Sequence, residues 1–166
     1  MRILLPIDDS PGSEEAITLL IDQMKPFGAE VYLMHVLDPF PERKAKEIRS
    51  DGMPDFVSAR LMQREFAREL LERAAKKLRG AGFLVSHSMQ EGEVIATILS
   101  ETKVWRADLI VMGSHPRKGI KGFFSRSVSE DVSREAVCSV EVVRIPAWSR
   151  LFIGKDPEVL SAAKYA

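Results

Sequence analysis

Short apolar runs alternate along the chain with segments in which apolar residues recur every three or four positions. Uninterrupted apolar runs of about 4–8 residues are typical of strands buried on both faces, and the helical spacing indicates amphipathic helices. Strands are predicted at 2–7, 31–37, 83–89, 107–112 and 138–145, and helices at about 11–25, 56–79, 94–102 and 127–135. Because 83–89 is less apolar than the others, we expect it nearer a sheet edge.

Local signals support the predicted helix boundaries. Ser10 is a good N-cap, and Pro11 falls at the first helical position, where its missing N–H costs nothing. Pro26 ends that first helix. In the longest helix the apolar stripe is carried by Met62, Phe66, Leu70, Ala74 and Leu78, which step by four, and by Ala67 and Leu71. These patterns predict that each helix turns one apolar face to a sheet.

The alternating order of strands and helices predicts an α/β fold. Such an order implies parallel strands joined by right-handed crossovers, and hence an open sheet with helices on both faces. Ligands of such sheets bind beyond the carboxyl ends of the strands, where the strand order reverses. In this chain the carboxyl ends of the strands lie at 8–10, 36–38, 90–93 and 113–127.

Two segments fall outside the alternation. Residues 38–55 contain three prolines around a charged stretch and are predicted to form a long exposed connection. We expect one domain over residues 1–146, and residues 147–166 to form an appended C-terminal segment, which could cover the edge of the last strand.

Composition narrows the function classes. The 166 residues include 24 basic and 24 acidic side chains, so the formal net charge is zero, which argues against a polybasic nucleic-acid-binding chain. The single cysteine, Cys138, excludes an intramolecular disulfide. The first apolar run reaches Asp8 too soon for a signal peptide, and no run is long enough for a membrane span. We therefore expect a cytoplasmic protein with no membrane partner.

The loop at 113–127 is the most informative segment for function. It joins a strand to a helix, contains three glycines, and carries four basic residues and no acid. Backbone N–H groups and basic side chains in such a turn can bind phosphate, although a solvated basic surface loop has the same composition. It is not a Walker-type loop, because no Gly-Lys-Ser/Thr follows it.

Three stretches make the chain resemble the universal stress protein family. They are PIDDS at 6–10, LMHVLDP at 33–39, and the run from Asp108 to Pro146 that begins DLIVMGS and ends VEVVRIP. The resemblance implies a flavodoxin-like (adenine nucleotide alpha hydrolase-like) sandwich of five parallel strands with helices on both faces. It also implies a homodimer formed through the last strand, 138–145.

Members of this family that bind ATP carry Gly-x2-Gly-x9-Gly-Ser/Thr. Gly113 and Ser127 match the first and last positions, whereas Pro116 and Arg126 replace the two inner glycines. Pro116 has no N–H to offer, and Arg126 places a side chain where the family has bare backbone. These changes could remove the phosphate site, or Arg126 could instead clamp an anion.

The resemblance implies a binding site for ATP or another adenine nucleotide. Ile7 and Val36 would frame adenine through backbone groups, Asp8 would meet the nucleotide, and Gly113 and Ser127 would face ribose and phosphates. The expected set is Ile7, Asp8, Val36, Gly113, Ser114, Gly122, Arg126, Ser127 and Val128. Asp8 has an alternative role in a turn with Asp9 and Ser10.

No catalytic residues or metal ligands are predicted. His35 lies inside an apolar strand and is expected to be a core histidine with a hydrogen-bond partner, and Cys138 to be a packing residue. Three hypotheses remain: a stress-response module that binds an adenine nucleotide, a family member that binds no nucleotide and acts through protein–protein contacts, and a slow nucleotide hydrolase.

Overall fold

A computed structural model describes residues 1–24, 26–37, 56–114 and 127–144 of the chain. Nine elements follow one another as the sequence predicts. They are β1 (Arg2–Pro6), α1 (Pro11–Gln23), β2 (Glu30–Leu37), α3 (Phe56–Gly80), β3 (Leu84–Glu91), α4 (Val94–Trp105), β4 (Leu109–Gly113), α5 (Val128–Glu135) and β5 (Ser139–Val143). The segments 38–55 and 147–166 lie outside the described residues, so their predicted roles stay predictions.

The five strands form one parallel sheet in the order β3-β2-β1-β4-β5. The predicted α/β sandwich of five parallel strands is confirmed, and β3 lies at an edge as its weaker apolar pattern indicates. The chain moves outward from β1 to β2 and β3, and then returns past β1 to β4 and β5. This reversal between β1 and β4 is a topological switch point of the Rossmann type, where ligands bind.

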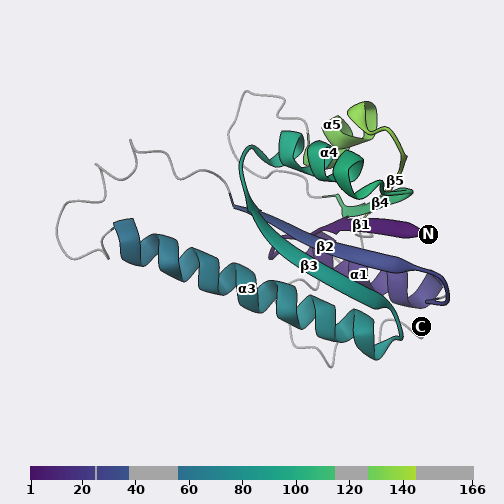
Figure 1. Ribbon diagram of the computed structural model, residues 1–166, viewed down its shortest axis with the longest axis horizontal. Helices are drawn as coiled ribbons and strands as arrows, with labels where there is room; N and C mark the ends of the chain where they lie inside the picture. The colour runs from purple at the N-terminus through teal and green to yellow at the C-terminus, as the bar shows by residue number, and fades with distance from the viewer. Residues whose placement is uncertain (25, 38–55, 115–126, 145–166) are drawn as a thin grey trace.

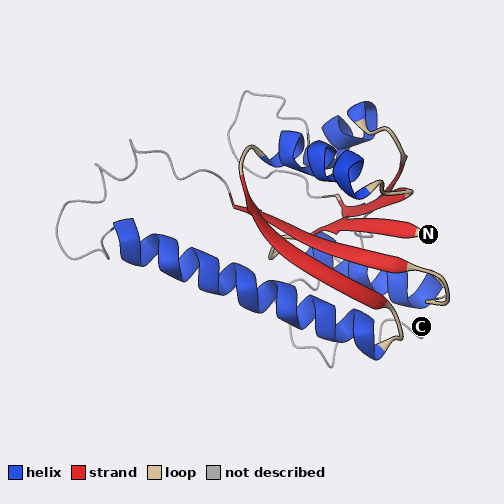
Figure 2. Cartoon of the chain, in the orientation of Figure 1, coloured by secondary structure: helices blue, strands red, loops and turns tan. Residues whose placement is uncertain are grey.

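Helices cover both faces of the sheet, with α1 and α3 on one face and α4 and α5 on the other (Figures 1 and 2). Successive residues of a strand point to opposite faces. On β1, Ile3 and Leu5 therefore pack with α1 and α3, whereas Leu4 packs with α4 and α5, and all three are fully buried. This alternation explains why the central strands are continuous apolar runs.

Helix α3 projects beyond the sheet at its N-terminal end (Figure 1). Met62 and Phe66 are 66% and 45% exposed, whereas Leu70, Ala74 and Leu78 are buried. The predicted stripe is thus wrong in its first half. Both residues lie in the N-terminal part of α3, which projects beyond the sheet, so the sheet does not cover them.

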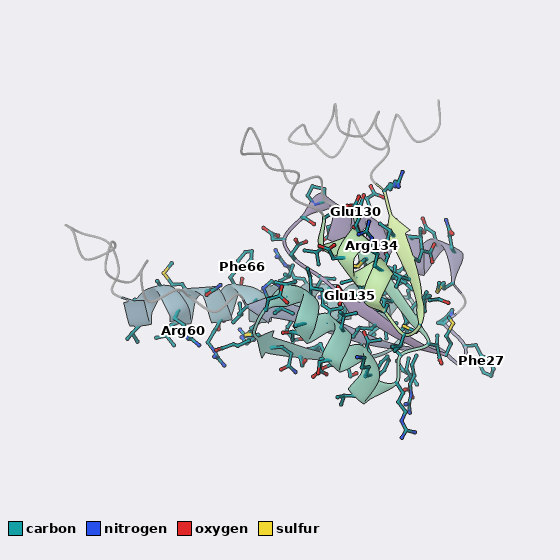
Figure 3. The ribbon with its side chains drawn as sticks, turned by 90° about the horizontal axis from the view of Figure 1, so that it is seen from above. Phe27, Arg60, Phe66, Glu130, Arg134 and Glu135 are labelled. Atoms are coloured by element: carbon teal, nitrogen blue, oxygen red, sulfur yellow. The ribbon has the colours of Figure 1, made fainter. Side chains whose placement is uncertain are left out.

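Two arginines join the projecting part of α3 to the sheet. Arg60 and Arg64 both form ion pairs with Glu91 at the end of β3. Figure 3 shows Arg60 and Phe66 on this part of the helix. The carboxyl end of β3 is therefore joined to α3 by charge as well as by apolar packing.

Cys138 packs beside the core cluster formed with α4 and α5. Burial raises the pKa of the Cys138 thiol, and the negative charge of Asp108 raises it further. A raised pKa keeps the thiol protonated at neutral pH, which suits a packing residue better than a nucleophile. None of the helices in the described part of the chain is long and apolar enough to cross a membrane.

Candidate functional site

A pocket of about 290 Å³ opens at the switch point, where β1, β2 and β4 end and α1 and α5 begin. Its apolar walls come from Met34, Val36, Ile98, Met112 and Val128. Its polar groups include Asp8, Ser10, Ser13, His35 and Ser129. The volume lies at the lower end of the usual range for small-molecule sites, and the mixture of apolar walls with a few polar groups is typical of them.

Asp8 is held in place by two serine hydroxyls from the start of α1. Ser13 Oγ accepts the Asp8 backbone N–H at 2.9 Å and donates to Asp8 Oδ1 at 2.7 Å. Ser10 Oγ donates to the same oxygen at 2.5 Å and caps α1 by accepting the Ser13 N–H at 3.3 Å. Asp8 therefore has the predicted role in the turn. Its Oδ1 accepts both serine hydroxyls, and its Oδ2 makes no hydrogen bond within the described part of the chain.

The first turn of α1 touches the end of β4 backbone to backbone. A Cβ placed on Gly113 would lie 2.2 Å from the Gly12 carbonyl carbon and oxygen. The two backbones can approach this closely because Gly113 has no side chain. This close approach draws the Asp8 turn against β4 and closes one side of the pocket.

The pairing of β1 with β2 stops just below the pocket. Its last register pair is Pro6 with Met34, and the Ile7 N–H still donates to the Met34 carbonyl at 2.8 Å. The Ile7 carbonyl then meets His35 Nδ1 at 2.8 Å. His35 is half-buried and has the partner expected of it, but it also lines the pocket.

Helix α5 brings its first turn to the pocket. Ser127 is its N-cap and forms a capping box, in which Ser127 Oγ accepts the Glu130 N–H at 3.3 Å and the Glu130 carboxylate accepts the Ser127 N–H at 3.4 Å. Ser127 Oγ also lies 3.0 Å from Ser129 Oγ. The N-terminal end of this helix carries a partial positive charge, which favours anions.

The structure brings together five of the nine expected site residues. Ile7, Asp8, Val36, Gly113 and Val128 line the pocket.

Two others, Ser114 and Ser127, are described and do not line it. The Ser114 N–H is bound to the Val143 carbonyl at 2.7 Å, and Ser127 caps α5, so neither appears in the pocket wall. Gly122 and Arg126 lie outside the described residues, as does Pro116.

Sequence reasoning missed Ser13 and Ile98 and assigned His35 to the core alone. Ser13 is only 5% exposed. The available sequence signal was a serine in the first turn of a helix that opens beside an Asp pair. His35 was visible as the polar residue of an otherwise apolar strand. Ile98 carried no signal, because an inward residue of α4 looks the same whether it faces a pocket or a filled core.

Among the described residues, no group of three or more His, Cys, Asp or Glu side chains is placed to hold a metal ion.

Comparison with known proteins gives a consistent result. Residues 1–144 match the model of the universal stress protein family. The universal stress protein MJ0531 of Methanocaldococcus jannaschii is 32% identical over 145 residues, which cover 87% of this chain and 82% of that protein.

Solved structures agree with the sequence comparison. The hypothetical protein MJ0577 is 27% identical with a TM-score of 0.71, covering 88% of this chain and 96% of that one. Two more distant structures hold nucleotides. A universal stress protein in complex with cAMP has a TM-score of 0.62 at 17% identity, covering 87% and 96% of the two chains. An Arabidopsis thaliana universal stress protein family protein with AMP bound has a TM-score of 0.65 at 18% identity, covering 90% and 94%.

Proposed function

The chain belongs to the universal stress protein family, and on that basis we propose that it is a stress-response binding module whose pocket takes an adenine nucleotide. The observation that carries the proposal is the place of the pocket. It lies at the switch point of the sheet, has apolar walls, and is lined on one side by Met34, His35 and Val36 at the end of β2. Fold relatives that hold cAMP and AMP support this ligand class.

Val36 provides the groups that would read the base. Alternate residues of a strand direct their backbone groups to opposite neighbours. The Met34 carbonyl faces β1 and the Leu37 carbonyl accepts the Gly92 N–H on the β3 side, so Val36 faces β1, as Met34 does. Within the described part of the chain the Val36 N–H and C=O make no bond to β1. An N–H and a C=O on one residue match N1 and the N6 amino group of adenine.

The ribose and phosphates would lie toward Asp8, Gly113 and the start of α5. The Asp8 carboxylate can accept from ribose hydroxyls, and the N-terminal end of α5 favours a phosphate. The described cavity suits a nucleoside with one phosphate. Whether further phosphates bind near Gly122 and Arg126 stays a prediction, and the ATP-binding form of the proposal depends on it.

We expect AMP to raise the melting temperature of the purified protein. At a free concentration ten times Kd the stabilisation would be about 1.4 kcal/mol, which corresponds to a rise of roughly 3–6 °C for a chain of this size. Inosine monophosphate is the matched control, because its N1 is a donor and its O6 an acceptor, the reverse of adenine. It should raise the melting temperature less.

If millimolar AMP, ADP, ATP and cAMP all leave the melting curve unchanged, nucleotide binding is refuted. The family member would then act through protein–protein contacts. The third hypothesis, a slow nucleotide hydrolase, would be favoured if phosphate release from ATP increases with the protein concentration and disappears in Asp8→Ala.

A homodimer formed through β5 is also part of the proposal. β5 lies at a sheet edge, and unpaired edges are usually protected. The Val143 carbonyl accepts the Ser114 N–H on the β4 side, so Val142 directs its N–H to the free edge. We expect Val142→Pro to give monomers with an unchanged circular dichroism spectrum, and Val142→Ala to remain dimeric in sedimentation velocity experiments. A monomeric wild type at micromolar concentration would contradict this.

The cytoplasm is the proposed location. The single cysteine of the chain supports it.

A further inference from the structure

We propose that His35 is a positioning residue that keeps the Val36 backbone open for the ligand. The proposal rests on the proposed binding of an adenine nucleotide and concerns the way this chain prepares the base-reading groups. Its basis is one backbone hydrogen bond between β1 and β2 that a regular parallel ladder would contain and that is not made among the described residues.

The ladder has the geometry to continue. The Ile7 N–H donates to the Met34 carbonyl at 2.8 Å, which is the last bond of the regular parallel pattern. In that pattern the next bond would run from the Val36 N–H to the Ile7 carbonyl. Among the described residues that bond is not made, although Ile7 is still bonded to β2 through its own N–H.

The His35 ring takes the place of the missing donor. Its Nδ1 lies 2.8 Å from the Ile7 carbonyl oxygen. A carbonyl only accepts, so Nδ1 carries the proton and the hydrogen bond fixes the tautomer of the neutral ring. The Ile7 carbonyl is thereby satisfied without Val36.

The consequence is an unused donor at the mouth of the pocket. Val36 lines the pocket, and its N–H faces the β1 side, where it makes no bond to β1 within the described part of the chain. If the ring were absent, the half-buried Ile7 carbonyl would lack a partner, and the Val36 N–H is the donor that a regular parallel ladder would bring to it. Closing that bond would remove the donor that adenine N1 needs.

Two variants separate this role from simple packing. Asn and Leu have nearly the same size and shape, but only Asn offers a donor near the position of Nδ1. We expect His35→Asn to bind AMP within about threefold of the wild type, and His35→Leu to bind about tenfold more weakly, the loss of roughly one hydrogen bond. His35→Met serves as a second variant without a donor if His35→Leu does not fold.

Amide hydrogen exchange tests the same step without any ligand. In His35→Leu the Val36 amide should exchange more slowly than in His35→Asn, because it has entered the ladder. The Leu33 amide in the core serves as the reference, since a general loosening would speed exchange at both positions.

The proposal is overturned if the two variants bind AMP equally, or if the Val36 amide exchanges at the same rate in both or faster in His35→Leu. If the wild type does not bind AMP, the proposed function fails, and the exchange comparison still decides whether His35 holds the Val36 amide open.

Discussion

Gly113→Ala is expected to destabilise the protein by about 3 kcal/mol, lowering the melting temperature by roughly 6–12 °C. The added methyl group would lie 2.2 Å from the carbonyl carbon and oxygen of Gly12. Both are backbone atoms at the first turn of α1, so no side chain can rotate away to relieve the overlap. Either the turn or the end of β4 must shift.

The same shift should weaken ligand binding. Gly12 lies between Ser10 and Ser13, whose hydroxyls hold the Asp8 carboxylate. Moving that turn by even a fraction of an ångström changes the position of Asp8 at the pocket. We therefore expect Gly113→Ala to lose AMP affinity as well as stability, as measured by calorimetric titration below its melting temperature.

Two other glycines serve as graded controls. A Cβ on Gly80, the last residue of α3, would meet nothing within 4 Å, so Gly80→Ala should be neutral or slightly stabilising. A Cβ on Gly12 would meet the Ser114 carbonyl oxygen at 3.2 Å, which predicts an intermediate effect. Wild-type stability in Gly113→Ala would show that the two backbones do not approach this closely.

The contact between Gly12 and Gly113 also marks what the sequence could not predict. Apolar periodicity predicted all five strands and the edge position of β3, because burial on two faces leaves a pattern that is local in the chain. A backbone contact between residues far apart in the sequence leaves no such pattern. Each glycine alone is compatible with an ordinary turn.

In the site, too, features with a local sequence pattern were predicted and contacts between distant residues were not. Ile7, Asp8, Val36, Gly113 and Val128 were predicted from motifs, and they meet at the pocket because parallel strands end at one edge. The roles of Ser13 and His35 depend on hydrogen bonds to residues on other elements or across a turn. Their partners are set by tertiary packing, so residue type and spacing could indicate that they matter but not what they hold.

Asp8→Asn is the second large effect, and we expect it to weaken AMP binding about thirtyfold, or roughly 2 kcal/mol. The amide oxygen of Asn can still accept from the Ser10 and Ser13 hydroxyls, so the turn should keep its shape. The amide nitrogen then presents donors where Oδ2 of the carboxylate offered an acceptor. A ribose hydroxyl loses its charged partner, while the melting temperature of the free protein should hardly change.

Asp9→Asn is the matched control, because the substitution removes the same charge at a neighbouring position. Asp9 is exposed and does not line the pocket. It should leave the affinity near that of the wild type. Analogues of AMP that lack the 2′- or the 3′-hydroxyl complete a double-mutant cycle with Asp8→Asn. The analogue that lacks the hydroxyl bound by Asp8 should lose little further affinity in the variant.

The sign of the effect locates Asp8 relative to the phosphate. Among the described residues that line the pocket, Asp8 is the only one with a carboxylate. A carboxylate beside a phosphate would repel it, so Asp8→Asn would then tighten AMP binding, and most strongly at low salt. Weaker binding with little dependence on salt places Asp8 at the ribose, whereas tighter binding would overturn the assignment and reverse the orientation of the nucleotide in the pocket.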